Sequence, residues 1–420
     1  MGSILLSATR GSFKSGLTRC GLNFNSSSNL AAAPRGLLQR RLTSASKFPL
    51  PNKVASFAFA FDIDGVLLHV AKPIPGAAES LQFLNDNNIP FILLTNGGGK
   101  HEKDRVADLT DKLGVKLTTE NFVQSHTPFR DLVENAEGLK EKTILVTGAD
   151  AHKCRQIAEA YGFQKVVTPA DILAANPTIF PFQTLMKEVY ENTWRPLPKP
   201  LYNPNKPSVD ALKFDAIFVF NDPRDWSLDI QIITDVLQSH NGIIGTYSPK
   251  NGDPNLPNHG WQGDSQPRIY FSNPDILWAA HFHQPRLGQG AFQASLDGVW
   301  RAITNGHSLQ RTVIGKPHQL TYEYAERVLN RHHFYLAGGK PGDDVDPLRN
   351  VYMVGDNPES DIRGANEFRS ANGANWLSLL VHTGVWSEVR GPPAHTPTVI
   401  VPDVREAVRW ALKREGMSGL

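Results

Sequence analysis

Short apolar runs alternate with longer amphipathic stretches from Val54 onward, and this alternation limits the fold more than any other feature of the chain. Runs that are almost entirely apolar suit strands covered on both faces, and the helices between them supply that cover. Strands are expected at 54–61, 91–94, 143–146, 214–220, 312–314, 351–354 and 376–381. Helices are expected at 77–86, 101–113, 128–137, 151–161, 227–239, 290–304, 319–331 and 403–414. The pattern predicts an α/β fold with a doubly wound parallel sheet.

Two proline-rich stretches interrupt this alternation in the middle third of the chain. Six prolines fall within 181–207, and four fall within 249–267. Proline lacks a backbone N–H and fixes φ, so neither stretch suits a regular helix or a central strand. Both stretches are therefore expected to be insertions.

The first acidic residue of the 420-residue chain is Asp62, and every charged residue before it is basic. Residues 1–52 are rich in Ser, Asn, Ala and Leu, and they lack the continuous apolar segment of a secretory signal. This composition predicts a mitochondrial transit peptide with a linker, and hence a mitochondrial protein, with the matrix as the expected compartment. A basic tail without a targeting role is the alternative.

Charge and cysteine content exclude several classes of protein. The 43 basic and 41 acidic residues leave a formal net charge of +2, which argues against nucleic-acid binding. Two cysteines are too few for a disulfide scaffold or a cysteine-rich zinc module. No apolar run approaches the ~18 residues that a membrane-spanning helix needs, so no membrane span is expected.

The first apolar run ends in two carboxylates, Asp62 and Asp64. Residues two apart face the same side of an extended chain, and ligands of open α/β sheets bind beyond the carboxyl ends of the strands. Two close carboxylates repel each other unless a cation neutralises them or one stays protonated. A hard cation such as Mg²⁺ meets that need because it prefers oxygen ligands. Capping of the next turn is the alternative role for the pair.

Candidate phosphate-binding groups follow two further runs. Thr95, Asn96 and Gly97 come directly after the run 91–94, and Lys316 follows the run 312–314. A hydroxyl, an amide and the N–H groups of a glycine turn suit phosphoryl oxygens. One ammonium offsets the charge of a carboxylate and a phosphate held together. An ordinary glycine turn and a solvated surface lysine are the alternatives.

A fourth run ends in Asp356, with Asp361 five residues further along. Asp356 is expected to bind the metal. Asp361 is expected either to bind it too or to serve as a negative charge at the start of a helix.

Together the four strand ends predict phosphoryl transfer to a carboxylate. Asp62 is expected to attack phosphorus, Asp64 to act first as a general acid and then as a base, and Lys316 to offset the charge of the nucleophile and the phosphate. The expected phosphate ligands are Thr95, Asn96, Gly97 and Lys316. The expected metal ligands are Asp62, Asp356, Asp361 and Asp64, the last through its backbone carbonyl.

In order and residue type, these motifs resemble those of haloacid-dehalogenase (HAD) superfamily hydrolases of subclass IIA. The resemblance rests on 62–66, 95–99, 315–317 and 355–366, and it extends through 125–128 and 380–385 to the mitochondrial cat-eye-syndrome critical-region HAD-like branch. It implies a Rossmann-like core with an α/β cap inserted between the second and third motifs, and Mg²⁺ as the cofactor. The implied segments are a core at 53–134 and 288–415 and a cap at 135–287.

The motifs and the resemblance predict a mitochondrial Mg²⁺-dependent phosphatase that acts on a small phosphorylated metabolite. Caps of this kind place a specificity loop over the site, so Asp222 and Arg224 are expected to contact substrate. The alternative is that both are ordinary polar residues of a surface loop. A slow HAD-fold binding or assembly protein, docking through its proline-rich loops, is the alternative function, followed by a phosphomutase. Subclass IIA caps often mediate dimers, so a homodimer is one expected assembly.

Overall fold

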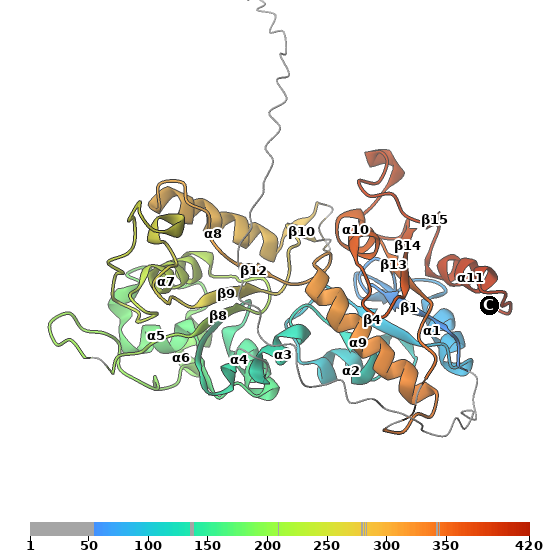
Figure 1. Ribbon diagram of the computed structural model, residues 1–420, viewed down its shortest axis with the longest axis horizontal. Coiled ribbons are helices and arrows are strands. Elements are labelled where there is room, and N and C mark those ends of the chain that lie inside the picture. The colour runs from blue at the N-terminus through green and yellow to red at the C-terminus, as the bar shows by residue number, and fades with distance from the viewer. Residues whose placement is uncertain are drawn as a thin grey trace, which may run out of the picture. The chain divides into compact units, whose positions relative to one another are not determined.

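The computed structural model describes residues 54–134, 138–208, 210–278, 280, 282, 284–341, 343 and 345–420. The predicted transit peptide and linker, residues 1–52, lie outside these ranges. Two separate parallel sheets organise the described chain (Figure 1).

The first sheet belongs to the core, and all of its neighbouring strands are parallel. Its six strands are, in spatial order, β15 (Val399–Val401), β14 (Asn375–Val381), β13 (Asn350–Gly355), β1 (Phe57–Phe61), β4 (Phe91–Leu94) and β5 (Phe122–Val123). Its helices are α1 (Ala77–Asp86), α2 (Glu102–Leu113), α9 (Gln319–Leu336), α10 (Arg363–Glu367) and α11 (Val404–Arg414).

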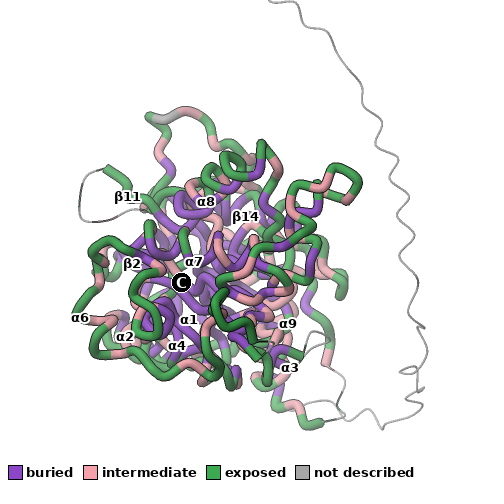
Figure 2. The backbone as a smooth tube through the Cα atoms, turned by 90° about the vertical axis from the view of Figure 1, so that its left-hand side faces the viewer, coloured by how far each residue is buried: buried purple, intermediate pink, exposed green. Residues whose placement is uncertain are grey.

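The two faces of β1 show why the core is doubly wound. Phe57, Phe59 and Phe61 pack with α1, α2 and α11 on one face. Ala58 and Ala60 pack with α9 and α10 on the other face. Every residue of β1 is buried, and Figure 2 shows buried residues gathered in the interior of the molecule. The prediction of a doubly wound α/β core is confirmed.

The second sheet belongs to the cap and is also parallel throughout. Its five strands are, in spatial order, β12 (Thr312–Val313), β9 (Arg268–Phe271), β8 (Ala216–Val219), β6 (Thr143–Thr147) and β7 (Lys165–Val167). Helices α3 (Asp131–Glu134) and α4 (Ala151–Tyr161) pack on one face, and α5 (Pro169–Ala175), α7 (Trp226–Gln238) and α8 (Gln289–Ile303) pack on the other. The cap is therefore α/β as well.

The cap is longer than the predicted range 135–287. Phe292, Leu296 and Trp300 of α8 belong to the buried cluster of the cap, and β12 pairs with β9. The boundary at 287 is wrong because the glycines at 288 and 290 do not lead back to the core. They open α8 against the backbone of Asp275, which leaves no room for a Cβ atom at either position. The second core segment begins at about residue 315, after β12.

Each of the predicted strand ranges contains a strand, and the predicted helices are present with small shifts in their ends. The range 128–137 begins as a 3₁₀ turn at Thr127–Arg130 before α3, and residues 135–137 lie outside the described part. Within the proline-rich stretch 181–207, one short helix, α6 (Lys187–Thr193), forms. The remaining strands form two hairpins, β2 (Leu68–His69) with β3 (Lys72–Pro73) and β10 (Leu277–Trp278) with β11 (Arg286–Leu287).

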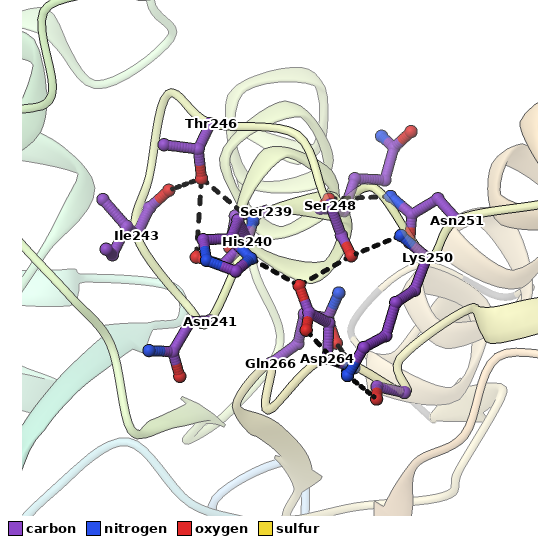
Figure 3. A network of polar contacts seen from close by, with 12 residues as sticks. Ser239, His240, Asn241, Ile243, Thr246, Ser248, Lys250, Asn251, Asp264 and Gln266 are labelled. Carbon is purple, nitrogen blue, oxygen red and sulfur yellow. Dashed lines mark hydrogen bonds and ion pairs between the residues drawn. The ribbon is translucent and has the colours of Figure 1, made fainter. Parts of the chain in front are cut away.

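A buried aspartate, Asp264, forms hydrogen bonds and an ion pair that hold the long irregular loop after α7 in the cap (Figure 3). Asp264 is 6% exposed. Its carboxylate accepts hydrogen bonds from His240 Nδ1 at 2.6 Å and Ser248 Oγ at 2.7 Å, and it pairs with Lys250 Nζ at 3.0 Å. Burial alone would raise the pKa of Asp264, but the hydrogen bonds from Ser248, Lys250 and His240 outweigh burial and lower the pKa to about 2.

Asp264→Asn is expected to lower the free energy of unfolding at neutral pH by about 1.5–3 kcal/mol, because it weakens hydrogen bonds to a charged group. The depressed pKa means that the carboxylate stabilises the fold above the unfolded value of about 3.9, and that this contribution is lost as pH falls toward 2. Urea midpoints of wild type and variant should therefore converge in acid. The control is Asp210→Asn, whose exposed carboxylate pairs with Lys199 at 2.6 Å. Equal midpoints for Asp264→Asn and this control at pH 7 would contradict the assigned role.

Candidate active site

The carboxyl ends of three adjacent core strands bring the predicted site together. Strand β1 pairs with both β13 and β4, and the chain continues from these strands into Asp62, Asp356 and Thr95. Because parallel strands end at the same edge of a sheet, three segments that are far apart in the chain meet there (Figure 1). Lys316 enters from another direction, at the turn where the chain leaves the cap strand β12.

Lys316 is the centre of the site. It is 1% exposed, and its Nζ lies 2.7 Å from Asp62 Oδ1 and 2.7 Å from Asp361 Oδ1. Burial alone would lower the pKa of Lys316, but the carboxylates of Asp361 and Asp62 outweigh burial and raise the pKa above its ordinary value. The lysine is therefore a permanent ammonium, and the alternative of a solvated surface lysine is wrong.

Three buried carboxylates form a compact acidic group. Asp62, Asp356 and Asp361 each offer an oxygen atom, and these atoms lie within 4.8 Å of one another. Burial, followed by the charges of Asp62 and Asp361, raises the pKa of Asp356 well above its usual range. Burial likewise raises the pKa of Asp361 to about 6, against the opposing effect of Lys316. One ammonium cannot balance three carboxylates, so the group fits a divalent cation with oxygen ligands.

Two glycines shape the position of Asp356. Its Oδ2 accepts a hydrogen bond from the Val385 backbone N–H at 2.6 Å. A Cβ atom on Gly65 would lie 2.4 Å from this oxygen, and one on Gly384 would lie 1.9 Å from it. Gly384 follows β14, the strand beside β13, and the sequence motifs assign it no role. The signal for Gly384 in the sequence is a Thr-Gly pair, Thr383 and Gly384, that follows the apolar run 376–381.

Asp64 lies at the edge of the site, with 63% of its side chain exposed. Its carboxylate is outside the compact acidic group. Desolvation by the surrounding protein, followed by the charge of Asp62, raises the pKa of Asp64, while Arg105 opposes this shift. Arg105 Nη2 lies 3.8 Å from Asp64 Oδ2. Arg105 was not predicted from the sequence, because only the packing of α2 brings it to the end of β1.

The predicted phosphate-binding segment has a defined local structure. Thr95 is 4% exposed, and its Oγ1 accepts a hydrogen bond from the Gly97 backbone N–H at 3.0 Å. Asn96 differs from the expectation, because both of its amide hydrogens are engaged elsewhere. Its Nδ2 donates to the Lys316 carbonyl oxygen at 2.9 Å and to Asp275 Oδ2 at 3.1 Å, and its Oδ1 accepts from the Lys316 N–H at 2.7 Å. In this structure Asn96 holds Lys316 in place and offers no free donor.

The motifs and the fold are matched by known families and relatives. The model of the haloacid dehalogenase-like hydrolase family matches residues 59–164, and a second model, described as HAD-hydrolase-like, matches 313–407. A mitochondrial hydrolase of Saccharomyces cerevisiae, YKR070W, is 41% identical over 372 residues, which cover 85% of this chain and 96% of that protein. The chain belongs to the haloacid dehalogenase-like hydrolase family.

Two further relatives extend the comparison. The cardiolipin synthase (CMP-forming)/mitochondrial hydrolase fusion protein of Schizosaccharomyces pombe is 39% identical over 89% of this HAD-like hydrolase, which spans only 56% of the fused chain. The ribonucleotide monophosphatase NagD of Escherichia coli K12, a subclass IIA neighbour, is 35% identical over 22% of this chain and 36% of its own. Phosphatases are thus among the relatives of this enzyme, consistent with a phosphoric monoester hydrolase.

A solved structure shares the fold. The 4-nitrophenylphosphatase of Thermotoga maritima superposes with a TM-score of 0.50 at 16% identity, over 84% of this hydrolase and 96% of that chain. Within the described ranges, no helix is long and apolar enough to cross a membrane.

The cap of the hydrolase reaches the catalytic core through Asp275, which the sequence motifs did not assign to the site. Its carboxylate accepts the hydrogen bond from Asn96, and burial raises its pKa to about 7. Burial raises the pKa of Asp222 against the opposing charge of Arg224. No hydrogen bond or ion pair among the described residues joins Asp222 or Arg224 to the three-carboxylate group or to Lys316.

Proposed function

We propose that this hydrolase is a Mg²⁺-dependent phosphatase that works through an aspartyl-phosphate on Asp62. The observation that carries the proposal is the buried ammonium of Lys316, held 2.7 Å from both Asp62 and Asp361 at the edge of the three-carboxylate group. A site with this charge pattern is suited to a phosphoryl group bound together with a divalent cation.

The core residues supply the two chemical steps. In the first step an Asp62 oxygen attacks phosphorus, the bond from phosphorus to the leaving oxygen breaks, and the carboxyl proton of Asp64 passes to that oxygen. In the second step Asp64, now a carboxylate, takes a proton from water as the water oxygen attacks phosphorus. Asp62 then leaves as a free carboxylate, and inorganic phosphate is released.

Asp62, Asp356 and Asp361 would hold Mg²⁺, with the backbone carbonyl of Asp64 as a further proposed ligand. When bound, the cation supplies charge that offsets the negative oxygens of the transferring phosphoryl group. Lys316 orients Asp62 through the 2.7 Å ion pair, while the Thr95 hydroxyl and the backbone N–H groups that follow Gly97 bind phosphoryl oxygens.

The proposed substrate is a small phosphorylated metabolite, and the proposed location is the mitochondrion. The name of the E. coli relative, a ribonucleotide monophosphatase, supports a small phosphomonoester. The names of the two yeast relatives, both mitochondrial hydrolases, support the location together with the acid-free composition of residues 1–52. The matrix, a cap-mediated homodimer and substrate contacts by Asp222 and Arg224 stay predictions.

A phosphomonoester of a lipid is the second candidate substrate. In the fission-yeast relative, a hydrolase part shares one chain with a part that makes the membrane phospholipid cardiolipin. A panel that contains nucleoside monophosphates, sugar phosphates and micellar lipid phosphomonoesters separates the two candidates. The proposed function fails if wild type with Mg²⁺ is no more active than Asp62→Asn on p-nitrophenyl phosphate and on every member of the panel.

Asp64→Asn is expected to lower kcat by about 10²–10⁴-fold, the usual contribution of general acid–base catalysis. The loss should be larger for alkyl phosphates than for p-nitrophenyl phosphate, because p-nitrophenolate needs little protonation as it leaves. The raised pKa of Asp64 keeps its acid form to higher pH, so the wild-type rate on alkyl phosphates should fall as pH rises through that pKa. The variant should lack this pH dependence.

The control is Asp104→Asn, at an exposed position of α2. Rates of both substrate classes and the pH profile should match those of wild type in this control. Asp64 is not the general acid if Asp64→Asn lowers kcat equally on alkyl and aryl phosphates. The same conclusion holds if the rate of the variant still falls with rising pH as that of wild type does.

A further inference from the structure

A buried polar network joins core helix α2 to cap helix α4 beside the phosphate-binding loop. The Tyr161 hydroxyl, at the end of α4, donates to Glu102 Oε1 at the start of α2. Between these helices, His126 Nδ1 lies 2.8 Å from the Tyr161 hydroxyl, and Thr127 Oγ1 donates to Glu102 at 2.9 Å. All four residues are buried, and the proposed phosphatase steps use none of them.

The ring of His126 lies between the Tyr161 hydroxyl and the loop 97–100. Tyr161 has one hydroxyl proton, which it gives to Glu102, so the Nδ1 of His126 must carry a proton and donate it to the tyrosine oxygen. Burial lowers the pKa of His126 to about 4, although Glu102 opposes the shift, so the ring is neutral at physiological pH.

The same segment packs directly against the loop that carries the phosphate-binding N–H groups, residues 97–100. The Gln124 side chain donates to the Lys100 carbonyl oxygen at 2.9 Å, and the Ser125 N–H donates to the Gly97 carbonyl oxygen at 3.2 Å, so both ends of the loop are held. A Cβ atom on Gly98 would lie 2.6 Å from Ser125 Oγ and 3.0 Å from His126 Cδ2. The loop therefore packs directly against Ser125 and His126, with no room for a side chain at position 98.

One polar atom at this contact is buried and unpaired. Ser125 Oγ has no hydrogen-bond partner among the described residues. Buried polar groups normally find partners, and unpaired ones cost free energy. Ser125 Oγ faces Gly98, inside the contact between this segment and the loop.

We propose that His126 and Tyr161 are positioning residues that hold the loop 97–100 in its phosphate-binding geometry and tie it to the cap. This inference rests on the proposed phosphatase function. Glu102 anchors the network on α2, and one turn further along the same helix Arg105 lies near Asp64. The network thus links the cap helix α4 to both the phosphate-binding loop and the edge of the site where the leaving group departs.

The test is Tyr161→Phe, which keeps the ring and removes the hydroxyl that bridges Glu102 and His126. The dissociation constant of inorganic phosphate, measured by calorimetry with Mg²⁺, should rise about five- to tenfold, the equivalent of one hydrogen bond. The KM for p-nitrophenyl phosphate should rise by a similar factor with kcat nearly unchanged, because the loop binds ground state and transition state alike.

The matched control is Tyr352→Phe in the core strand β13. Tyr352 is buried as well, and its hydroxyl donates to a carboxylate, Glu415 Oε1, at 2.5 Å in a partly buried hydrogen bond. Both variants should lose a similar amount of thermal stability, but phosphate affinity should change only in Tyr161→Phe. His126→Ala should reproduce that change. His126→Asn, whose amide nitrogen replaces Nδ1–H, should recover part of the affinity.

An unchanged phosphate affinity and KM in Tyr161→Phe, with only a lower Tm, would overturn the inference and leave the network a purely structural role. Equal changes in both tyrosine variants would overturn it as well. A wild-type protein that neither binds phosphate nor hydrolyses any phosphomonoester would overturn the proposed function itself. The two failures are thereby distinguishable.

Discussion

Asp62→Asn is expected to lower kcat on every phosphomonoester by at least about 10³-fold, while the protein stays folded. An amide is a poor nucleophile toward phosphorus, so the first step has no substitute for the carboxylate. Loss of this charge leaves Lys316 paired with Asp361 at 2.7 Å, and it reduces repulsion within the acidic group. The buried ammonium therefore keeps a partner, and no loss of stability is expected.

Steady-state kinetics of purified Asp62→Asn, together with its melting temperature, check this expectation. Asp86→Asn, at an exposed position of α1, is the control for a neutralised aspartate and should match wild type in both measurements. A residual activity of a tenth of wild type or more, in a preparation shown by mass spectrometry to contain no reverted aspartate, would rule out Asp62 as the nucleophile.

Lys316→Met is expected to have the second largest effect, and it acts on stability as well as rate. Removal of Lys316, which pairs with Asp62 and Asp361, leaves carboxylates buried without their partner, which typically costs about 3–5 kcal/mol. Mg²⁺ should restore much of this loss, because a cation held by the same carboxylates replaces the missing charge. The activity should remain low even with Mg²⁺.

Thermal unfolding in EDTA and in Mg²⁺ measures both parts of this prediction. The Mg²⁺-induced rise in Tm should be larger for Lys316→Met than for wild type. Lys199→Met, which breaks the exposed pair with Asp210, should behave as wild type because surface ion pairs contribute little. If the Tm values of Lys316→Met and Lys199→Met were the same in EDTA, the charge balance assigned to Lys316 would be wrong.

The sequence alone predicts the parts of this hydrolase that depend on strands. Buried parallel strands such as β1 and β13 are almost entirely apolar, and their ends carry Asp62 and Asp356. The carboxyl ends of parallel strands lie at the same edge of a sheet. Predicting the strands therefore also predicts that Asp62 and Asp356 lie close together. The structure brings Asp62, Asp356, Asp361 and Lys316 together, and their roles in catalysis and metal binding stay predictions.

Features that depend on packing between distant segments were not predicted. Arg105 reaches Asp64 only because α2 lies against the end of β1, and Asp275 reaches Asn96 only because the cap lies over the core. The boundary at 287 was wrong for a similar reason, since a glycine turn signals a change of direction and not a change of domain. Only the pairing of β12 with β9 shows where the cap ends.

The most direct test of the account is chemical trapping of the intermediate. Wild-type enzyme and Mg²⁺ are mixed with a substrate, quenched in acid within milliseconds and reduced with borohydride, which converts an aspartyl-phosphate to homoserine. Peptide mass spectrometry should then find substrate-dependent homoserine at position 62 and at no other aspartate. Turnover of the substrate without modification of Asp62, or with modification of a different residue, would contradict the mechanism.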